Sequence, residues 1–119
     1  MDEDDNKPIL DVVFYKTEAG KEPVREWLKS LPREDRRTIG EDIKTAQYGW
    51  PLGMPLIRKM ERGLWEVRSS ISTGIARVFF TVKDAMMILL HGFVKKSQKT
   101  PPNELDTARR RLNNLQSAA

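Results

Sequence analysis

The chain has 119 residues and a formal net charge of +4, with no cysteine and a single histidine. This length is typical of one domain with one hydrophobic core. The absence of cysteine excludes disulfides, cysteine nucleophiles and thiolate metal sites, and one histidine argues against a histidine-cluster metal site. No apolar run approaches the roughly 20 residues of a membrane span, and the first residues, MDEDDNK, are acidic where a secretion signal is basic. We therefore expect a cytoplasmic protein.

The charge is unevenly distributed along the chain. Residues 56–119 carry twelve Lys or Arg against five Asp or Glu, whereas residues 1–55 carry nine against twelve. The C-terminal half therefore has a formal charge of +7 and the N-terminal half −3. Such a basic half favours a polyanionic partner such as nucleic acid, although a merely solvated basic face is the alternative.

The N-terminal half predicts a flexible acidic tail over residues 1–8, followed by a single domain over residues 9–116. The β-branched and aromatic stretch ILDVVFY, residues 9–15, predicts a first strand. Residues 23–31 begin with a proline and place apolar residues at i, i+3, i+4 and i+7, which predicts a short amphipathic helix. Residues 33–48 predict a second, more charged helix antiparallel to the first.

After a Gly- and Pro-rich loop, the apolar pattern changes to a period of two. Four strands are predicted, joined by short connections that favour consecutive antiparallel hairpins: residues 56–60, 64–70, 75–82 and 86–94. Pro101 and Pro102 then precede a predicted C-terminal helix with an apolar stripe. The predicted fold class is α+β: a small, mostly antiparallel twisted sheet with two N-terminal helices and one C-terminal helix, packed on one face.

The strand pattern brings charged residues together. In LWEVR, Glu66 and Arg68 share one strand face, and a hairpin centred between Ser72 and Thr73 places Arg68 directly opposite Arg77. Like charges in this position repel. Either Glu66 neutralises both arginines in an exposed ion cluster, or a bound phosphate does so through the bidentate donors of arginine.

The only histidine, His91, ends the apolar run MMILLH. A histidine at a strand end is often a hydrogen-bonded structural residue. If its strand pairs with the strand of Arg77, however, His91 comes near that arginine. Three lysines, Lys95, Lys96 and Lys99, then follow at the edge of the same surface and can extend it along a polyanion.

Two further kinds of residue can add to this surface. Lys59 and Arg58 lie in the strand before ERG, although only alternate residues of a strand share a face. Trp50 and Trp65 can stack on bases. Core packing is the alternative for Trp65, which has the opposite parity to Glu66, and closure of the loop is the alternative for Trp50.

Such residues suit RNA cleavage without a metal. The 2′-hydroxyl of RNA attacks the adjacent phosphate, so the protein needs only to align the strand, move protons and stabilise the extra negative charge. Arginines and lysines provide the last function, and a histidine or glutamate can act as general acid or base. DNA lacks the internal nucleophile.

The order of LWEVRSS, IARVFF and ILLHGFVKKSQKTP, with A-R-R-R in the final helix, resembles the HigB-like, phage-derived branch of the RelE/ParE toxin superfamily. The resemblance covers roughly residues 9–115. It implies the RelE-like microbial RNase fold and the toxin of a type II toxin-antitoxin system. Such a toxin cleaves translated mRNA in the ribosomal A site, with neither metal nor cofactor.

The resemblance also implies partners and site residues. The partners are the ribosome with its mRNA and a cognate HigA-like antitoxin with a helix-turn-helix domain, which alone brings the complex to operator DNA. Catalytic residues carried over by position are Arg68 and Arg77, with Glu66 and His91 as candidates for proton transfer. The resemblance carries over Lys95, Lys96 and Lys99 as RNA-binding residues, and the strand pattern adds Lys59 to this set. The chain lacks the second histidine of some HigB toxins and the tyrosine that some RelE-type toxins place in the last strand or loop.

Two other functions fit the same fold. ParE-type toxins poison DNA gyrase through a protein interface, so the fold alone does not distinguish the targets. A non-catalytic nucleic-acid-binding module would use the basic face for binding only. The opposed arginines and the lysine-rich segment favour RNA cleavage.

Overall fold

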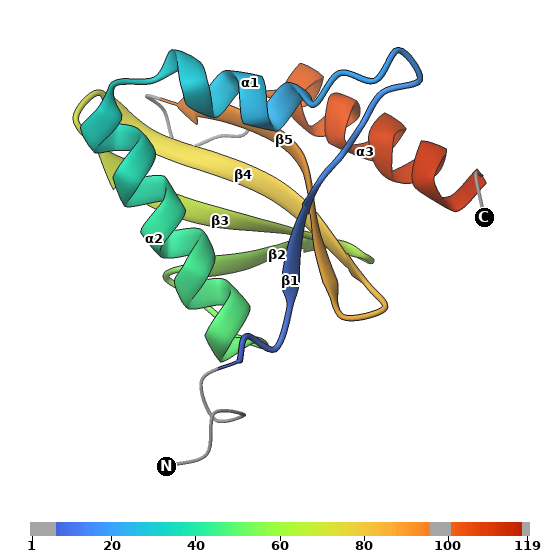
Figure 1. Ribbon diagram of the computed structural model, residues 1–119, viewed down its shortest axis with the longest axis horizontal. Helices are drawn as coiled ribbons and strands as arrows, with labels where there is room; N and C mark the ends of the chain where they lie inside the picture. The colour runs from blue at the N-terminus through green and yellow to red at the C-terminus, as the bar shows by residue number, and fades with distance from the viewer. Residues whose placement is uncertain (1–6, 96–100, 118–119) are drawn as a thin grey trace.

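The computed structural model describes residues 7–95 and 101–117. It contains one five-stranded sheet and three helices, as predicted (Figure 1). The elements are β1 (Asp11–Phe14), α1 (Pro23–Ser30), α2 (Arg33–Gly49), β2 (Ile57–Glu61), β3 (Leu64–Ile71), β4 (Gly74–Lys83), β5 (Met86–Lys95) and α3 (Pro102–Ser117). Most of the predicted acidic tail, residues 1–6, lies outside the described residues.

The strands lie in the order β1-β5-β4-β3-β2. β2 to β5 form the predicted consecutive antiparallel hairpins, and β1 pairs with β5 in parallel at the other edge. The two-residue turn between β4 and β5 places Asp84 and Ala85 at positive φ, which matches the twist of the flanking strands. The fold is therefore α+β, and its sheet is mostly antiparallel.

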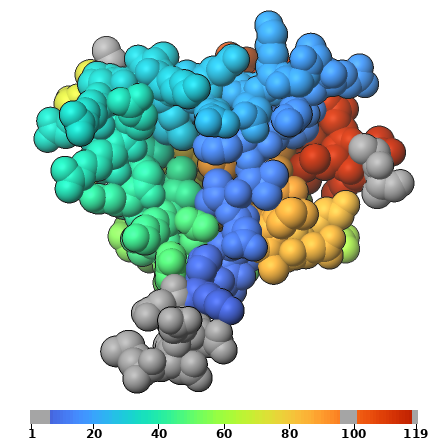
Figure 2. All heavy atoms as spheres, viewed as in Figure 1, coloured from blue at the N-terminus to red at the C-terminus, as the bar shows by residue number. Residues whose placement is uncertain are grey.

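The helices cover both faces of the sheet, so the prediction that they pack on one face is wrong. α1 and α2 bury Val24, Ile39 and Ile43 in one apolar core, whereas α3 buries Ala108 and Leu112 in a second core on the opposite face. Side chains alternate between the two faces along each strand, and the apolar stripe of α3 covers the face that α1 and α2 leave free. In the space-filling view, α1, α2 and the β1 segment cover most of the first face (Figure 2).

The two N-terminal helices do not form the expected antiparallel pair. α1 lies across one end of the sheet, while α2 runs down along it (Figure 1). Gly92 of β5 explains the position of α1, because a Cβ at this residue would overlap the indole of Trp27. Each helix is thus held by the sheet rather than by its neighbour.

No helix among residues 7–95 and 101–117 is long and apolar enough to cross a membrane.

Candidate functional site: a basic cluster on the sheet

Arg68 and Arg77 lie directly opposite each other on the hairpin of β3 and β4, which confirms the predicted register. The turn of this hairpin is tied to α2. The buried carboxylate of Asp35 accepts hydrogen bonds from the backbone N–H and the hydroxyl of Ser72, at 3.2 and 2.9 Å. The contact spans 37 residues of sequence, and nothing in the strand pattern indicated it. It fixes the end of the hairpin that carries the two arginines.

Glu66 lies between the two arginines. Its Oε1 atom is 2.7 Å from a terminal nitrogen of Arg77 and 3.8 Å from Nε of Arg68. The side chains of Glu66 and Arg77 are 0% and 2% exposed, while that of Arg68 is 25% exposed. The carboxylate therefore pairs with both arginines, as one alternative expected, but inside the protein rather than in an exposed cluster, and one positive charge is left over. Only Arg68 keeps substantial access to solvent.

Two more cations join this group. Arg58 pairs with Glu66 across β2 and β3 and shares its face, and Lys95 pairs with Ile75 at the end of β5. Burial, reinforced by the charge of Arg77, lowers the pKa of Lys95. We call Arg58, Arg68, Arg77 and Lys95, together with Glu66, the basic cluster. Its four cations face one carboxylate.

The basic cluster contains buried donors with no protein partner. Among the described residues, three donor atoms of the cluster, Nε of Arg68, Nε of Arg77 and Nζ of Lys95, are buried and make no hydrogen bond, and one acceptor, Oε2 of Glu66, is in the same situation. Buried donors without a partner are costly, so they favour a ligand that supplies acceptors. Arg68 also lines a cleft of about 430 Å³ between β3 and α2, beside Thr38 and Asp42. This cleft gives a ligand a route to the arginine.

His91 lies on the same face as Arg77 but is turned toward α3. His91 pairs with Phe79 of β4, and the next cross-strand pair on the same face is that of Phe93 with Arg77. Nε2 of His91 is 3.1 Å from a carboxylate oxygen of Glu104, and Nδ1 is 3.4 Å from a terminal nitrogen of Arg111. Burial lowers the pKa of His91, and the contact with Glu104 opposes this shift. Both ring nitrogens thus contact the terminal helix rather than the basic cluster.

The predicted RNA-binding lysines have different locations. Lys59 pairs with Trp65, on the opposite face of the sheet from Glu66, so its expected place beside the arginines is wrong. Its neighbour Arg58 takes that place because side chains alternate along a strand. Lys95 belongs to the basic cluster. Lys96 and Lys99 lie outside the described residues.

The tryptophans pack against the sheet rather than beside the arginines. The rings of Trp50 and Trp65 meet edge to face with centroids 5.1 Å apart, and both pack against Phe80 in the core under α1 and α2. The core alternative for Trp65 is therefore confirmed. Trp50, in the loop after α2, closes that loop over the same core.

The arrangement is suited to binding an anion and stabilising negative charge on it. Clustered guanidinium and ammonium groups in a partly water-excluded place act strongly on a developing charge. No group of three or more His, Asp or Glu side chains within residues 7–95 and 101–117 is arranged to hold a metal ion. The sequence pattern indicated Arg58 as a possible member of the site, but Lys59 was the predicted one. It gave no signal for Glu104 and Arg111, because contacts between a strand and a distant helix have no local pattern.

Comparison with protein families identifies a family that matches most of the chain. The model of the family described as phage derived protein Gp49-like (DUF891) matches residues 26–113, about three quarters of the chain. The matched region begins in α1 and ends in α3, so it includes the whole basic cluster. A comparison with curated proteins gave no match.

Proposed function

The chain belongs to the phage-derived Gp49-like family, a RelE-like toxin family of toxin-antitoxin systems, and from this premise we propose that it is a HigB-like toxin of a type II system. The proposed activity is ribosome-dependent cleavage of translated mRNA in the cytoplasm. Cleavage in the ribosomal A site would stop translation and growth. Family membership supports the toxin and its antitoxin partner, while the nuclease activity rests on the basic cluster.

The observation that carries the nuclease proposal is the pair of opposed arginines sharing a single buried carboxylate. Arg68 and Arg77 face each other, and Lys95 lies beside them with no hydrogen-bond partner among the described residues. A phosphate at this point would accept hydrogen bonds from Arg68 and reduce the repulsion between the cations. The same contacts would strengthen as negative charge builds up at phosphorus.

The proposed roles follow from exposure. Arg68 contacts the reacting phosphate, because it is the exposed arginine of the opposed pair and lines the cleft. Arg77 and Lys95 are buried and stabilise the negative charge of the phosphate electrostatically, without contacting it. Lys96 and Lys99 remain proposed contacts to flanking mRNA or ribosomal RNA, on the resemblance alone, and Lys59 can contact RNA only from the opposite face.

On the resemblance, proton transfer is proposed for His91, whose side chain is 19% exposed, rather than for Glu66, which is fully buried against Arg77. This role requires His91 to exchange its contact with Glu104 or Arg111 for one with the RNA. In the cleavage step, the 2′-oxygen loses its proton and forms a bond to phosphorus, while the bond to the 5′-oxygen breaks and that oxygen gains a proton. Glu66 then serves to hold Arg77 in place. An undiminished single-turnover rate for His91→Ala would leave the histidine a structural role only.

The proposed partners are a cognate antitoxin and the ribosome. The antitoxin is proposed to be HigA-like, with a helix-turn-helix domain through which the complex reaches operator DNA. No role is proposed for a metal, a cofactor or a membrane.

The deciding experiment maps 5′ ends of a defined mRNA incubated with programmed ribosomes and the purified protein. Cuts within codons that require ribosomes and disappear with Arg68→Ala are expected. Arg37→Ala is the matched control, because Arg37 is an arginine of α2 that is 80% exposed and lies outside the basic cluster. Intact mRNA with folded protein would refute the proposal. Inhibition of gyrase supercoiling would then identify a ParE-like poison, and RNA binding alone a non-catalytic module.

A further inference from the structure

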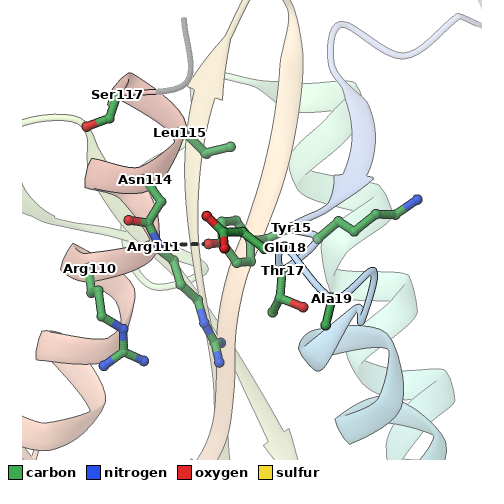
Figure 3. A pocket seen from close by; sticks show the side chains of 10 residues that line it. Tyr15, Thr17, Glu18, Ala19, Arg110, Arg111, Asn114, Leu115 and Ser117 are labelled. Atoms are coloured by element: carbon green, nitrogen blue, oxygen red, sulfur yellow. Dashed lines mark hydrogen bonds between the residues drawn. The ribbon is translucent and has the colours of Figure 1, made fainter.

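A groove of about 710 Å³ lies between the segment that follows β1, residues 15–19, and the C-terminal half of α3 (Figure 3). It is separate from the cleft beside Arg68. Its charged lining residues are Lys16, Glu18, Arg110 and Arg111. Three of these four residues are cations.

Arg111 is held rigidly at the wall of the groove. One of its terminal nitrogens donates a 2.7 Å hydrogen bond to the backbone oxygen of Leu90, and its guanidinium lies 5.7 Å from the centre of the Tyr15 ring. That ring is fixed in turn, because the side-chain amide of Asn114 donates a 3.1 Å hydrogen bond to the Tyr15 hydroxyl. A guanidinium held in this way loses little conformational entropy on binding a ligand.

The side chains of Arg110 and Arg111 extend in the same direction along α3, away from Asn114 (Figure 3). Helical side chains tilt toward the helix N-terminus, which explains this common direction. The carboxylate of Glu18 reaches toward Tyr15 and Asn114 instead (Figure 3). The groove thus has a cationic end and a separate acidic end.

The two arginines have no acidic partner in the part of the chain that the structure describes. By contrast, the preceding residue, Arg109, makes two 2.8 Å contacts to the carboxylate of Glu61. Burial, and after it the charge of Arg110, lowers the pKa of Arg111. An anion placed between Arg110 and Arg111 would relieve this repulsion and gain charge-assisted hydrogen bonds.

Arg111 connects the groove to β5, the strand that also carries Lys95 of the basic cluster. Arg111 contacts His91, and His91, Phe93 and Lys95 lie on the same side of this strand. At about 3.3 Å per residue, Lys95 lies about 13 Å beyond His91. A single strand with bases stacked at about 3.4 Å spans this distance with about four nucleotides.

We propose that the cationic end of the groove binds a backbone phosphate of the same RNA strand whose reacting phosphate lies at the basic cluster, with Arg110 and Arg111 as its ligands. The inference rests on the proposed RNA substrate. Arg111 supplies the pre-positioned guanidinium and Arg110 the exposed one. Glu18 disfavours a second phosphate at the other end of the groove.

The test measures binding of a single-stranded RNA of about 12 nucleotides, protected by 2′-O-methylation, by fluorescence anisotropy at several salt concentrations. Arg110→Gln is compared with Arg37→Gln, which removes the same charge from a distant helix. Loss of one phosphate contact from a single strand lowers the slope of log K against log salt by about 0.7. We expect this change and severalfold weaker binding for Arg110→Gln alone, and tighter binding for Glu18→Gln.

Equal slopes for the two arginine variants would overturn the inference. So would weaker binding by Glu18→Gln, which would indicate that the carboxylate recognises a base, or preferential, Arg110-dependent binding of a polyglutamate peptide, which would indicate a protein ligand. Ribosomal cleavage by the parent protein separates the two proposals. Cuts with equal slopes, or cuts without binding of the free RNA, overturn only the groove, because the proposed cleavage takes place on the ribosome. No cuts with a reduced slope for Arg110→Gln overturn only the nuclease, and the absence of both cuts and RNA binding overturns both.

Discussion

Replacing Glu66 by glutamine tests whether the buried carboxylate holds the opposed arginines together. Glu66 is 0% exposed and lies 2.7 Å from Arg77, which is itself 2% exposed. Removing one partner of a buried ion pair leaves an uncompensated charge and costs about 3–5 kcal/mol. In a domain of this size, about 1 kcal/mol shifts Tm by about 4 °C, so we expect a fall of about 12–20 °C.

The assay is urea and thermal unfolding followed by circular dichroism. Glu61→Gln is the matched control, because Glu61 pairs with Arg109 at the surface, where the two side chains are 36% and 46% exposed. An exposed pair contributes about 1 kcal/mol or less. A Glu66→Gln loss no larger than that of the control would refute the reasoning.

A double-mutant cycle then isolates the interaction with Arg77. In the background of Arg77→Met, Glu66→Gln should cost less than in the parent, because Arg77, the buried cation nearest to the carboxylate, is already gone. Equal costs in both backgrounds would show that Glu66 stabilises the fold through other contacts.

Three further predictions concern single side chains. Lys95→Met should raise the free energy of unfolding at pH 7 by roughly 1–3 kcal/mol, because it removes a buried ammonium that has no hydrogen-bond partner among the described residues. The same variant should bind RNA more weakly. A lower free energy of unfolding than in the parent would contradict the first expectation. The pKa of His91 is lower in the folded protein, so the unfolded chain binds a proton at this residue more readily, and the stability that His91 contributes is full above pH 6.5 and is lost as the pH falls below it. Between pH 7.5 and pH 5.5, the free energy of unfolding should therefore fall less for His91→Phe than for the parent protein. Equal falls would contradict the assignment. Trp65→Ala should cost about 3 kcal/mol in unfolding experiments and leave RNA affinity unchanged, whereas lost affinity with little change in stability would indicate base stacking.

The basic cluster shows where local patterns were sufficient. Alternation placed Glu66 and Arg68 on one face, and the short turn at Ser72 placed Arg68 opposite Arg77, because a hairpin's register follows from its turn. The same alternation allowed only one of Arg58 and Lys59 to face the cluster. It did not say which, since that depends on the register between β2 and β3.

Burial was the main quantity that the sequence did not supply. The sequence pattern of Glu66 and Arg77 is also compatible with charges exposed to solvent, and only the packing on the second face of the sheet shows that both side chains are buried. The sequence predicted a histidine at a strand end, either hydrogen-bonded and structural or close to Arg77, and it did not identify the partners of the ring. Its partners Glu104 and Arg111 lie 13 and 20 residues away on a helix whose position no local pattern determines.

The sequence by itself determined the strands, the helices, their order and the opposed arginines, because these depend on periodicity and short turns over a few residues. The tertiary structure decided that α3 covers the second face, that Glu66 and Arg77 are buried, and that Arg111 contacts Tyr15 and His91 and lines a groove. Those features arise from contacts between segments far apart in the chain. The free energy of these contacts depends on which face of the sheet each helix covers, and no short stretch of sequence determines this.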